Sequence, residues 1–217
     1  MEARCVDIGG DGRRWVIVAA LLLAFPGAAH AQEAACGSLA FSGYGPFDYR
    51  TATPEQRAIV ERNHFTPQVE NLREAMTGAI GGDLAYTLRA FPNHVRALSA
   101  MARLSKREGK EVPTASPYSI ECWFERAIRF RPDDAQVRIL VAMELAGTGR
   151  SDEARKHLLA AEQNVGTDPN IAYNLGLAYL KLREFDIAMK YARIAYGGGY
   201  PLPGLRNALL RQGKWKE

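Results

Sequence analysis

The chain has 217 residues, of which 47% are hydrophobic and 24% charged, so it is long enough for one domain with a continuous core. Its net charge of +4 and isoelectric point near 9.0 raise the question of nucleic-acid binding. The basic residues, however, are interleaved with acidic ones, as in Lys181-Leu182-Arg183-Glu184, which is typical of a solvated helical face. We therefore expect no nucleic-acid partner.

The N-terminal segment, residues 1–31, has the pattern of a secretory signal peptide. Arg13-Arg14 precede an apolar run over residues 15–25, and Ala29-His30-Ala31 offers a cleavage site with small residues. The run is shorter than the roughly 20 residues that span a bilayer. We expect cleavage after Ala31, a periplasmic or secreted protein over residues 32–217, and no integral membrane segment after cleavage.

Two variants of this interpretation stay open. The paired arginines also occur in twin-arginine export signals, although no Ser or Thr precedes them here. Cys36 is a candidate lipidation site, although Glu33 occupies a position where a lipobox carries an aliphatic residue.

Cleavage would remove Cys5 and leave Cys36 and Cys122. Two cysteines in an oxidising compartment favour one disulfide, which would close a loop of about 85 residues and stabilise the fold by on the order of 4 kcal/mol. The alternative is a buried Cys122 and a free Cys36.

The N-terminal arm, residues 32–53, places four aromatic residues among glycines and a proline, which exclude a long helix. They are Phe41, Tyr44, Phe47 and Tyr49. The arm is expected either to cap the first exposed apolar face of the domain or to offer an aromatic surface to a partner.

Two helices are predicted next, over about 54–63 and 67–77. Thr53-Pro54-Glu55-Gln56 reads as a capping box, and Thr66-Pro67 repeats the combination of a cap and a proline. The apolar spacing of Val69, Leu72 and Met76 favours a helix over a loop for the second segment.

Small residues then recur at a fixed step of 34 in the sequence. One step takes Ala142, Ala154 and Ala161 to Gly176, Ala188 and Ala195, respectively, and the same step takes Ala127 to Ala161. Such a step is typical of a repeated helical pair, in which small residues let two helices approach closely where they cross.

The last of these segments resembles the tetratricopeptide repeat. It carries Leu175, Gly176, Tyr179, Ala188 and Ala195 of the family pattern, with Ala172 in place of the usual tryptophan. The middle segment keeps the alanines and lacks both the glycine and the tyrosine. The resemblance implies an all-α fold, a right-handed solenoid of antiparallel helix pairs, with about three repeats plus capping helices.

On this basis residues 54–217 form one helical repeat domain. The repeats are placed at about 67–92, 93–134, 135–168 and 169–201, with a C-terminal cap over 202–217. The step from Pro92 to Pro132 is 40 rather than 34, and the loop Lys106–Tyr118 is the expected place for the excess. In the cap, Leu205, Leu209 and Leu210 are expected to face the last repeat.

In the family, the first helix of each repeat lines a concave groove that takes a peptide or a helix. Those helices are expected here at about 94–105, 135–147 and 169–181. The candidate groove residues are Tyr173, Asn174, Leu177, Lys181, Met143, Arg96 and Arg103, with Ile139 beside them. An apolar centre with basic edges suits an acidic or C-terminal segment, although Ile139 and Leu177 are equally compatible with core positions.

Catalysis has little support in the sequence. His64, His94 and His157 are isolated, without the spacing of a metal site, and no nucleophile elbow or phosphate loop is present. His64 and His94 lie beside proline-containing turns and are expected to cap or pack. No catalytic residue, cofactor or metal is expected.

The sequence therefore predicts a non-catalytic exported adaptor that binds a protein or peptide segment in its concave groove. The alternative is an obligate structural accessory subunit of an envelope complex for secretion, pilus or outer-membrane assembly. A small hydrolase or peptidoglycan-active enzyme built on helices is a third, weaker possibility.

Overall fold

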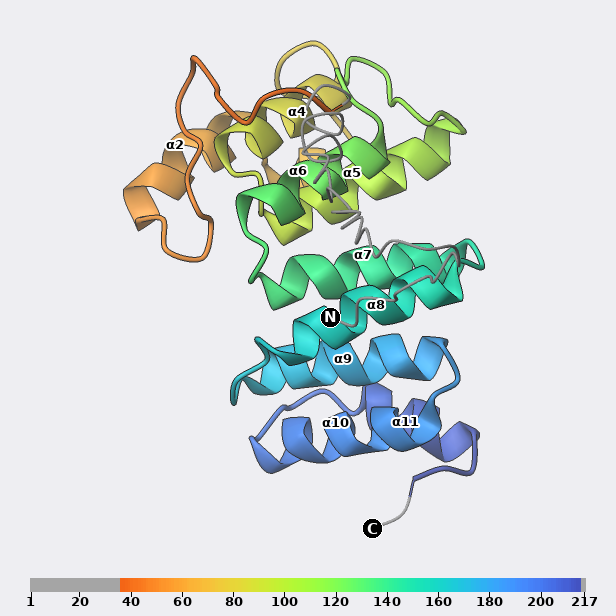
Figure 1. Ribbon diagram of the computed structural model, residues 1–217. Coiled ribbons are helices and arrows are strands. Elements are labelled where there is room, and N and C mark those ends of the chain that lie inside the picture. The colour runs from red at the N-terminus through yellow and green to blue at the C-terminus, as the bar shows by residue number, and fades with distance from the viewer. Residues whose placement is uncertain (1–35, 216–217) are drawn as a thin grey trace, which may run out of the picture.

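The computed structural model describes residues 36–215, which form ten helices and no strand (Figure 1). The helices are α2 (Pro54–His64), α3 (Pro67–Glu70), α4 (Ile80–Ala90), α5 (Val95–Glu108), α6 (Ile120–Phe130), α7 (Ala135–Gly147), α8 (Ser151–Glu162), α9 (Pro169–Lys181), α10 (Phe185–Gly197) and α11 (Gly204–Arg211). The expected all-α class is confirmed for this part of the chain.

The predicted signal peptide and its cleavage after Ala31 lie outside the described residues. Within residues 36–215, every helix is too short or too polar to cross a bilayer.

Neighbouring helices pack on one another along the chain. Figure 1 shows α7 to α11 in successive layers below the group formed by α4, α5 and α6. Helix α7 packs along α8, and α9 packs along α10, in each case across a short connection. Helix α7 also contacts α9, so each pair is in contact with the next.

The helix starts follow from local side-chain caps. Asp134 accepts hydrogen bonds from the backbone N–H groups of Gln136 and Val137, and Asp168 accepts one from Asn170, with Pro169 at the first helical position. These caps confirm the predicted bounds 135–147 and 169–181. The capping box at Thr53 is also present at the start of α2.

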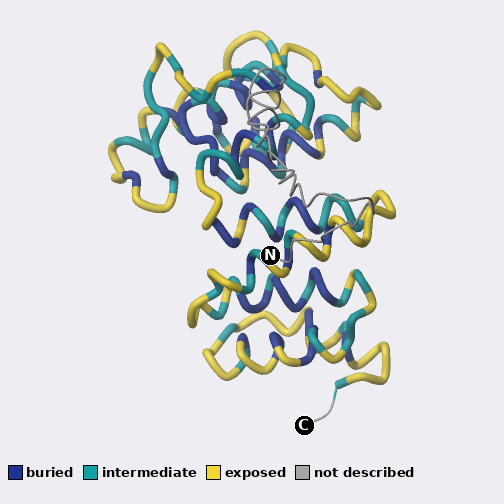
Figure 2. Tube along the Cα trace, viewed as in Figure 1, coloured by how far each residue is buried: buried dark blue, intermediate teal, exposed yellow. Residues whose placement is uncertain are grey.

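The small residues that recur along the sequence are buried, as expected. Ala127, Ala142, Ala154, Ala161, Ala188 and Ala195 are each at most 1% exposed. Figure 2 shows the buried positions running through the inside of the stacked helices, with exposed residues in the connections. Helix α7 contributes to two core clusters, because Ile139 and Ala142 belong to the C-terminal one and Val137 and Val141 to the N-terminal one.

Gly176 lies where α9 approaches α10 and α11 closely. A Cβ atom added there would lie 2.4 Å from Cδ2 of Leu205 and 3.3 Å from the carbonyl oxygen of Ala188. Both contacts are shorter than ordinary van der Waals distances, so only glycine lets α9 pack this closely on α10 and α11.

The predicted helix over 67–77 is wrong in its extent, because α3 ends at Glu70. Leu72 has a positive φ of 57°, and the backbone N–H groups of Met76 and Thr77 donate to the carboxylate of Asp83 at 2.7 and 3.1 Å. These N–H groups are thereby satisfied by α4 instead of by helical carbonyls. Met76, expected on an apolar helix face, is 50% exposed.

The C-terminal cap is present as α11, but only two of its three leucines face inward. Leu205 and Leu209 are fully buried, whereas Leu210 is 53% exposed. Successive helical residues turn by about 100°, so the residue after Leu209 points away from the face that Leu205 and Leu209 share. The expectation for Leu210 is therefore wrong.

The N-terminal arm is fixed to α6 at its first described residue. The Sγ atoms of Cys36 and Cys122 lie 2.08 Å apart, the distance of a disulfide bond. Beside it, the buried guanidinium of Arg126 donates through Nη1 to the carbonyl oxygens of Cys36, Gly37 and Ser38 at 2.9, 3.2 and 2.7 Å. The predicted cysteine pairing agrees with this geometry.

The arm's aromatic residues pack on the domain itself. Phe41 meets Tyr86 of α4 edge to face at 5.7 Å, and Phe47 and Tyr49 both contact Phe91. Tyr44 packs on Phe47 at 5.0 Å. These contacts favour the interpretation of the arm as a cap over α4.

Replacing Gly176 by alanine is expected to destabilise the protein, although alanine has the higher helix propensity by about 1 kcal/mol. The matched control is Gly197→Ala at the end of α10, where an added Cβ meets nothing within 4 Å. We expect the Gly176→Ala variant to be less stable than the Gly197→Ala variant by at least about 1 kcal/mol in urea unfolding. Equal stabilities would show that the close approach at Gly176 is relieved at no cost.

Removing the disulfide by Cys36→Ser with Cys122→Ser is expected to lower the free energy of unfolding by about 4 kcal/mol, because its two cysteines are separated by 86 in the sequence. Chemical denaturation of the oxidised protein, the reduced protein and the double variant measures this. The reduced protein and the variant should coincide, and a reduced protein as stable as the oxidised one would contradict the expectation.

Candidate functional site

A hollow of about 260 Å³ lies where α3, α5, α7 and α9 meet. We call it the groove. It is lined by Glu70, Val95, Arg96, Ser99, Arg103, Gln136, Ile139, Leu140, Met143 and Asn174. Besides Glu70 of α3, the groove thus has aliphatic side chains from α7, two guanidinium groups from α5 and one amide from α9. Its surface combines apolar and charged groups from helices that are far apart in sequence.

The basic edge of the groove is held by Glu70 of α3. Arg96 Nε donates to Glu70 Oε1 at 2.7 Å, and Arg103, two turns further along α5, donates to the backbone carbonyl of Glu70 at 2.5 Å. The hydrogen bond from Arg96 holds the pKa of Glu70 below its ordinary value, and the same bond raises the pKa of Arg96. Both groups are therefore charged at neutral pH, and Glu70 occupies donors that an anionic ligand would use.

Four of the seven residues proposed from the sequence line this hollow. They are Arg96, Arg103, Met143 and Asn174. Ile139 lines it as well while being only 2% exposed, so it has both the groove and the core position that the sequence left open.

The other three candidates lie outside this lining. Tyr173 is 8% exposed and stacks on Tyr200 with ring centroids 4.0 Å apart. Leu177 packs against the C-terminal core cluster. Lys181 donates through Nζ to the backbone carbonyl of Met143 at 2.8 Å, which bridges the ends of α9 and α7.

The helices that carry the groove are positioned by a buried polar cluster at their first residues. Asn93, next to the cap of α5, donates through Nδ2 to Asp48 Oδ1 at 2.7 Å and to Asp134 Oδ2 at 2.8 Å. Asp134 is the cap of α7, and Asp48 belongs to the arm. Asn93 therefore joins the starts of α5 and α7 directly, and the arm adds a contact to the same amide through Asp48.

Asp48 is the centre of this cluster and is 8% exposed. Besides Asn93, it pairs with Arg50 and Arg131, each at 2.8 Å. Burial alone would raise the pKa of Asp48, but hydrogen bonds from Arg50 and Asn93 outweigh it and lower the pKa to about 2.

His64 and His94 cap a helix or pack within the fold, as expected. His94 is fully buried, accepts the N–H of Ala97 through Nδ1 as the cap of α5, and stacks on Tyr49 at 3.8 Å. Burial lowers the pKa of His94 below its ordinary value. His64 lies 3.0 Å from Asp83 through Nδ1 and stacks on Tyr86.

A second hollow, of about 420 Å³, lies between α6, α7 and α8. Val141 and Leu145 of α7 form part of its floor, and Arg150 spans its rim with ion pairs to Glu121 and Glu153 at 2.5 and 2.8 Å. The groove uses Ile139 and Met143 of the same helix, so the two hollows lie on different faces of α7. Sequence reasoning missed it because its rim is assembled from charged residues of separate helices.

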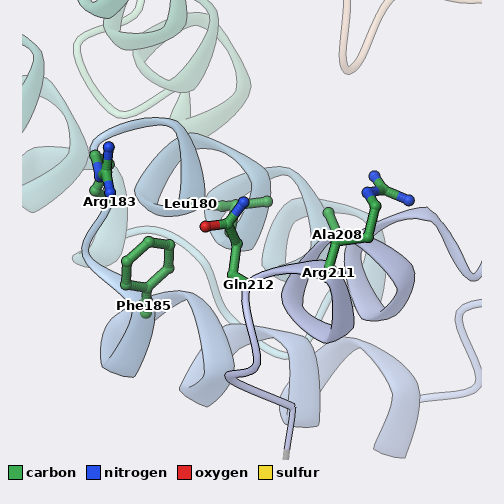
Figure 3. Close-up of a pocket in the computed structure, with 6 residues that line it drawn as sticks. All are labelled: Leu180, Arg183, Phe185, Ala208, Arg211 and Gln212. Atoms are coloured by element: carbon green, nitrogen blue, oxygen red, sulfur yellow. The ribbon is translucent and has the colours of Figure 1, made fainter.

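A third, smaller hollow of about 170 Å³ lies between α9, α10 and α11 (Figure 3). Leu180, Phe185, Ala208 and Gln212 line its middle, and Arg183 and Arg211 stand at opposite edges. Arg183 has a left-handed backbone with a φ of 63°, where the corresponding positions after α5 and α7 carry Gly109 and Gly149. A bulky cation thus occupies a backbone position that favours glycine.

Within residues 36–215, no group of three His, Cys, Asp or Glu side chains is placed to hold a metal ion. The expectation that no cofactor is bound stays a prediction.

Comparisons with protein-family models, curated proteins and solved structures find no match. Function is therefore inferred from the residues and their geometry alone.

The low pKa of Asp48 predicts acid sensitivity of the groove scaffold. A carboxylate whose folded pKa lies below its ordinary value of 3.8 stabilises the fold above about pH 4, and this contribution is lost as the pH falls through about 2. This contribution to the free energy of unfolding is about 2 kcal/mol. Asp48→Asn should lower the free energy of unfolding at neutral pH and flatten its fall between pH 4 and pH 2 in urea unfolding.

Asp152→Asn is the control for this measurement, because Asp152 is exposed in the first turn of α8. That variant should keep the acid dependence of the unsubstituted protein. An Asp48→Asn variant with the same acid dependence as the control would contradict the assignment.

Proposed function

We propose that the protein is a non-catalytic exported adaptor of the tetratricopeptide type that binds an acidic peptide segment in the groove. The observation that carries the proposal is the convergence of Arg96 and Arg103, Met143, and Asn174, from three different helices, on one hollow. Guanidinium groups at the edge of the groove can bind carboxylates, and aliphatic side chains on its floor can pack against the rest of a peptide. Binding of this kind requires no chemical reaction.

The resemblance to helix-pair repeats is supported by the spacing of the helix starts. Helices α7 and α9 begin at Ala135 and Pro169, a step of 34 in the sequence, and α5 begins at Val95, a longer step of 40 before α7. The connection between α5 and α6, residues 109–119, accommodates the longer step. The packing of α7 on α8 and of α9 on α10 supports paired neighbouring helices, and the right-handed solenoid of antiparallel pairs is part of the proposal.

The ligand chemistry follows from the groove's own charges. Glu70 already places one carboxylate against Arg96, so a ligand carboxylate would take the place of Glu70 at this edge in a contact of the same charge-assisted kind. The side chain of Arg96 is 61% exposed, so it remains accessible to a partner from solvent. Asn174 supplies an amide that can donate to and accept from the backbone of an extended peptide.

A peptide display library panned on the purified chain from Gln32 onward tests the proposal. Enriched peptides should be acidic, and Arg96→Gln with Arg103→Gln should weaken their binding about tenfold or more, because two charge-assisted contacts are lost. Glu70→Gln should strengthen binding by removing the competing carboxylate. Affinities are measured by fluorescence anisotropy.

The matched control is Arg62→Gln with Arg73→Gln, which removes two exposed cations at the N-terminal end of the domain. It should change the affinity by less than about twofold, since exposed charges away from a ligand are screened. Enrichment of peptides without acidic residues, or equal losses in both double variants, would contradict the groove as the binding site.

A further inference from the structure

The positive charge of the chain is concentrated at its C-terminal end. The segment 181–217 contains eight Lys or Arg and three Asp or Glu, a net charge of +5, whereas the whole chain carries +4. The segment 1–180 therefore carries a net charge of −1. Local interleaving of charges in the sequence conceals this asymmetry. Most of the basic segment forms α10 and α11, which lie together at one end of the stack (Figure 1).

Several of these cations are available to a ligand. Within the described chain, Arg183, Arg206, Arg211 and Lys214 form no ion pair with a carboxylate. Arg206 lies against two aromatic rings instead, 4.7 Å from the centroid of Tyr196 and 5.0 Å from that of Trp215. Arg183 and Arg211 stand at the edges of the hollow in Figure 3.

Exposed apolar side chains lie among these cations. Leu202 is 56% exposed, Leu210 is 53% exposed and Ile194 is 40% exposed. Leu210 and Arg211 project from the outer half of α11, opposite the buried Leu205 and Leu209, and Arg206 lies at the side of this face, one turn before Leu210. The outer face of α11 thus combines an exposed leucine with flanking arginines.

We propose that this C-terminal face, formed by Leu202, Arg206, Leu210, Arg211, Lys214 and Trp215, docks on the surface of a bilayer containing anionic phospholipids. Aliphatic side chains flanked by cations, with a tryptophan beside them, match the boundary between lipid headgroups and acyl chains. The two arginines at the adjacent hollow offer donors to a lipid phosphate.

A lipid surface fits these observations better than an acidic protein does. Leu202 and Leu210 are each more than half exposed, and a fluid interface needs no shape complementarity to bury them. An acidic protein would neutralise the cations and leave those leucines without partners. The groove draws its residues from α3, α5, α7 and α9, so membrane docking adds to the proposed adaptor function and does not depend on it.

Vesicle co-sedimentation tests the inference on the chain from Gln32 onward, which keeps every described residue and omits the apolar run at 15–25. Binding is expected to vesicles of phosphatidylcholine mixed with phosphatidylglycerol, and not to phosphatidylcholine alone. Arg206→Gln with Arg211→Gln should reduce partitioning roughly 25-fold, at about fivefold for each cation near an anionic surface. High salt should reduce it as well.

Arg62→Gln with Arg73→Gln is the control of equal charge, and it should change partitioning by less than about twofold. Leu202→Ser with Leu210→Ser should weaken binding to anionic vesicles while leaving the charge unchanged. Melting temperatures check that each variant is folded. The leucine variant is expected to melt like the unsubstituted protein, because both substituted side chains are exposed. Equal binding to both kinds of vesicle, equal losses in the two arginine variants, or binding to poly-glutamate without binding to anionic vesicles would overturn the proposal.

Discussion

The carboxylate of Asp48 is the constraint on which the N-terminal half of the molecule depends. It is buried between Asn93, Arg50 and Arg131, so displacement of the arm, which carries both Asp48 and Arg50, would deprive Asn93 and Arg131 of this carboxylate. Asn93 extends the contact to Asp134, the cap of α7. The hydrogen bonds of Asn93 thereby join the starts of α5 and α7 to each other and to the arm, and these two helices carry the groove's basic edge and apolar floor.

Most helices could be placed from the sequence, because their starts are local. Asp134 and Asp168 cap α7 and α9 with their own side chains, and no distant residue is needed to define where those helices begin. The prediction of a helix over 67–77 was wrong for the opposite reason. The apolar residues of this segment have helical spacing, but the backbone N–H groups of Met76 and Thr77 donate to the carboxylate of Asp83. A contact of this kind between two segments cannot be read from the spacing of apolar residues.

The site was predictable where helix order determines it. Arg96, Met143 and Asn174 come together because they lie on α5, α7 and α9, and α7 contacts both α5 and α9. Tyr173 departs from this pattern because Tyr200, in the connection after α10, offers a ring to stack on. The C-terminal basic face was hidden by alternation of charges along the chain, since only the folded arrangement shows which acids are already paired, as Glu184 is with Arg155.

The arm's dependence on later segments has a consequence for the order of synthesis. Cys36 and Asp48 leave the ribosome early, whereas their partners Cys122 and Arg131 follow only after the whole stretch that forms α2 to α5. The arm's aromatic side chains wait for a shorter time, because the rings on which they pack, Tyr86 and Phe91, emerge with α4 and directly after it. The first part of the described chain to emerge is therefore among the last to be fixed by its disulfide and ion pairs, and the nascent protein carries an exposed aromatic segment until α4 has emerged.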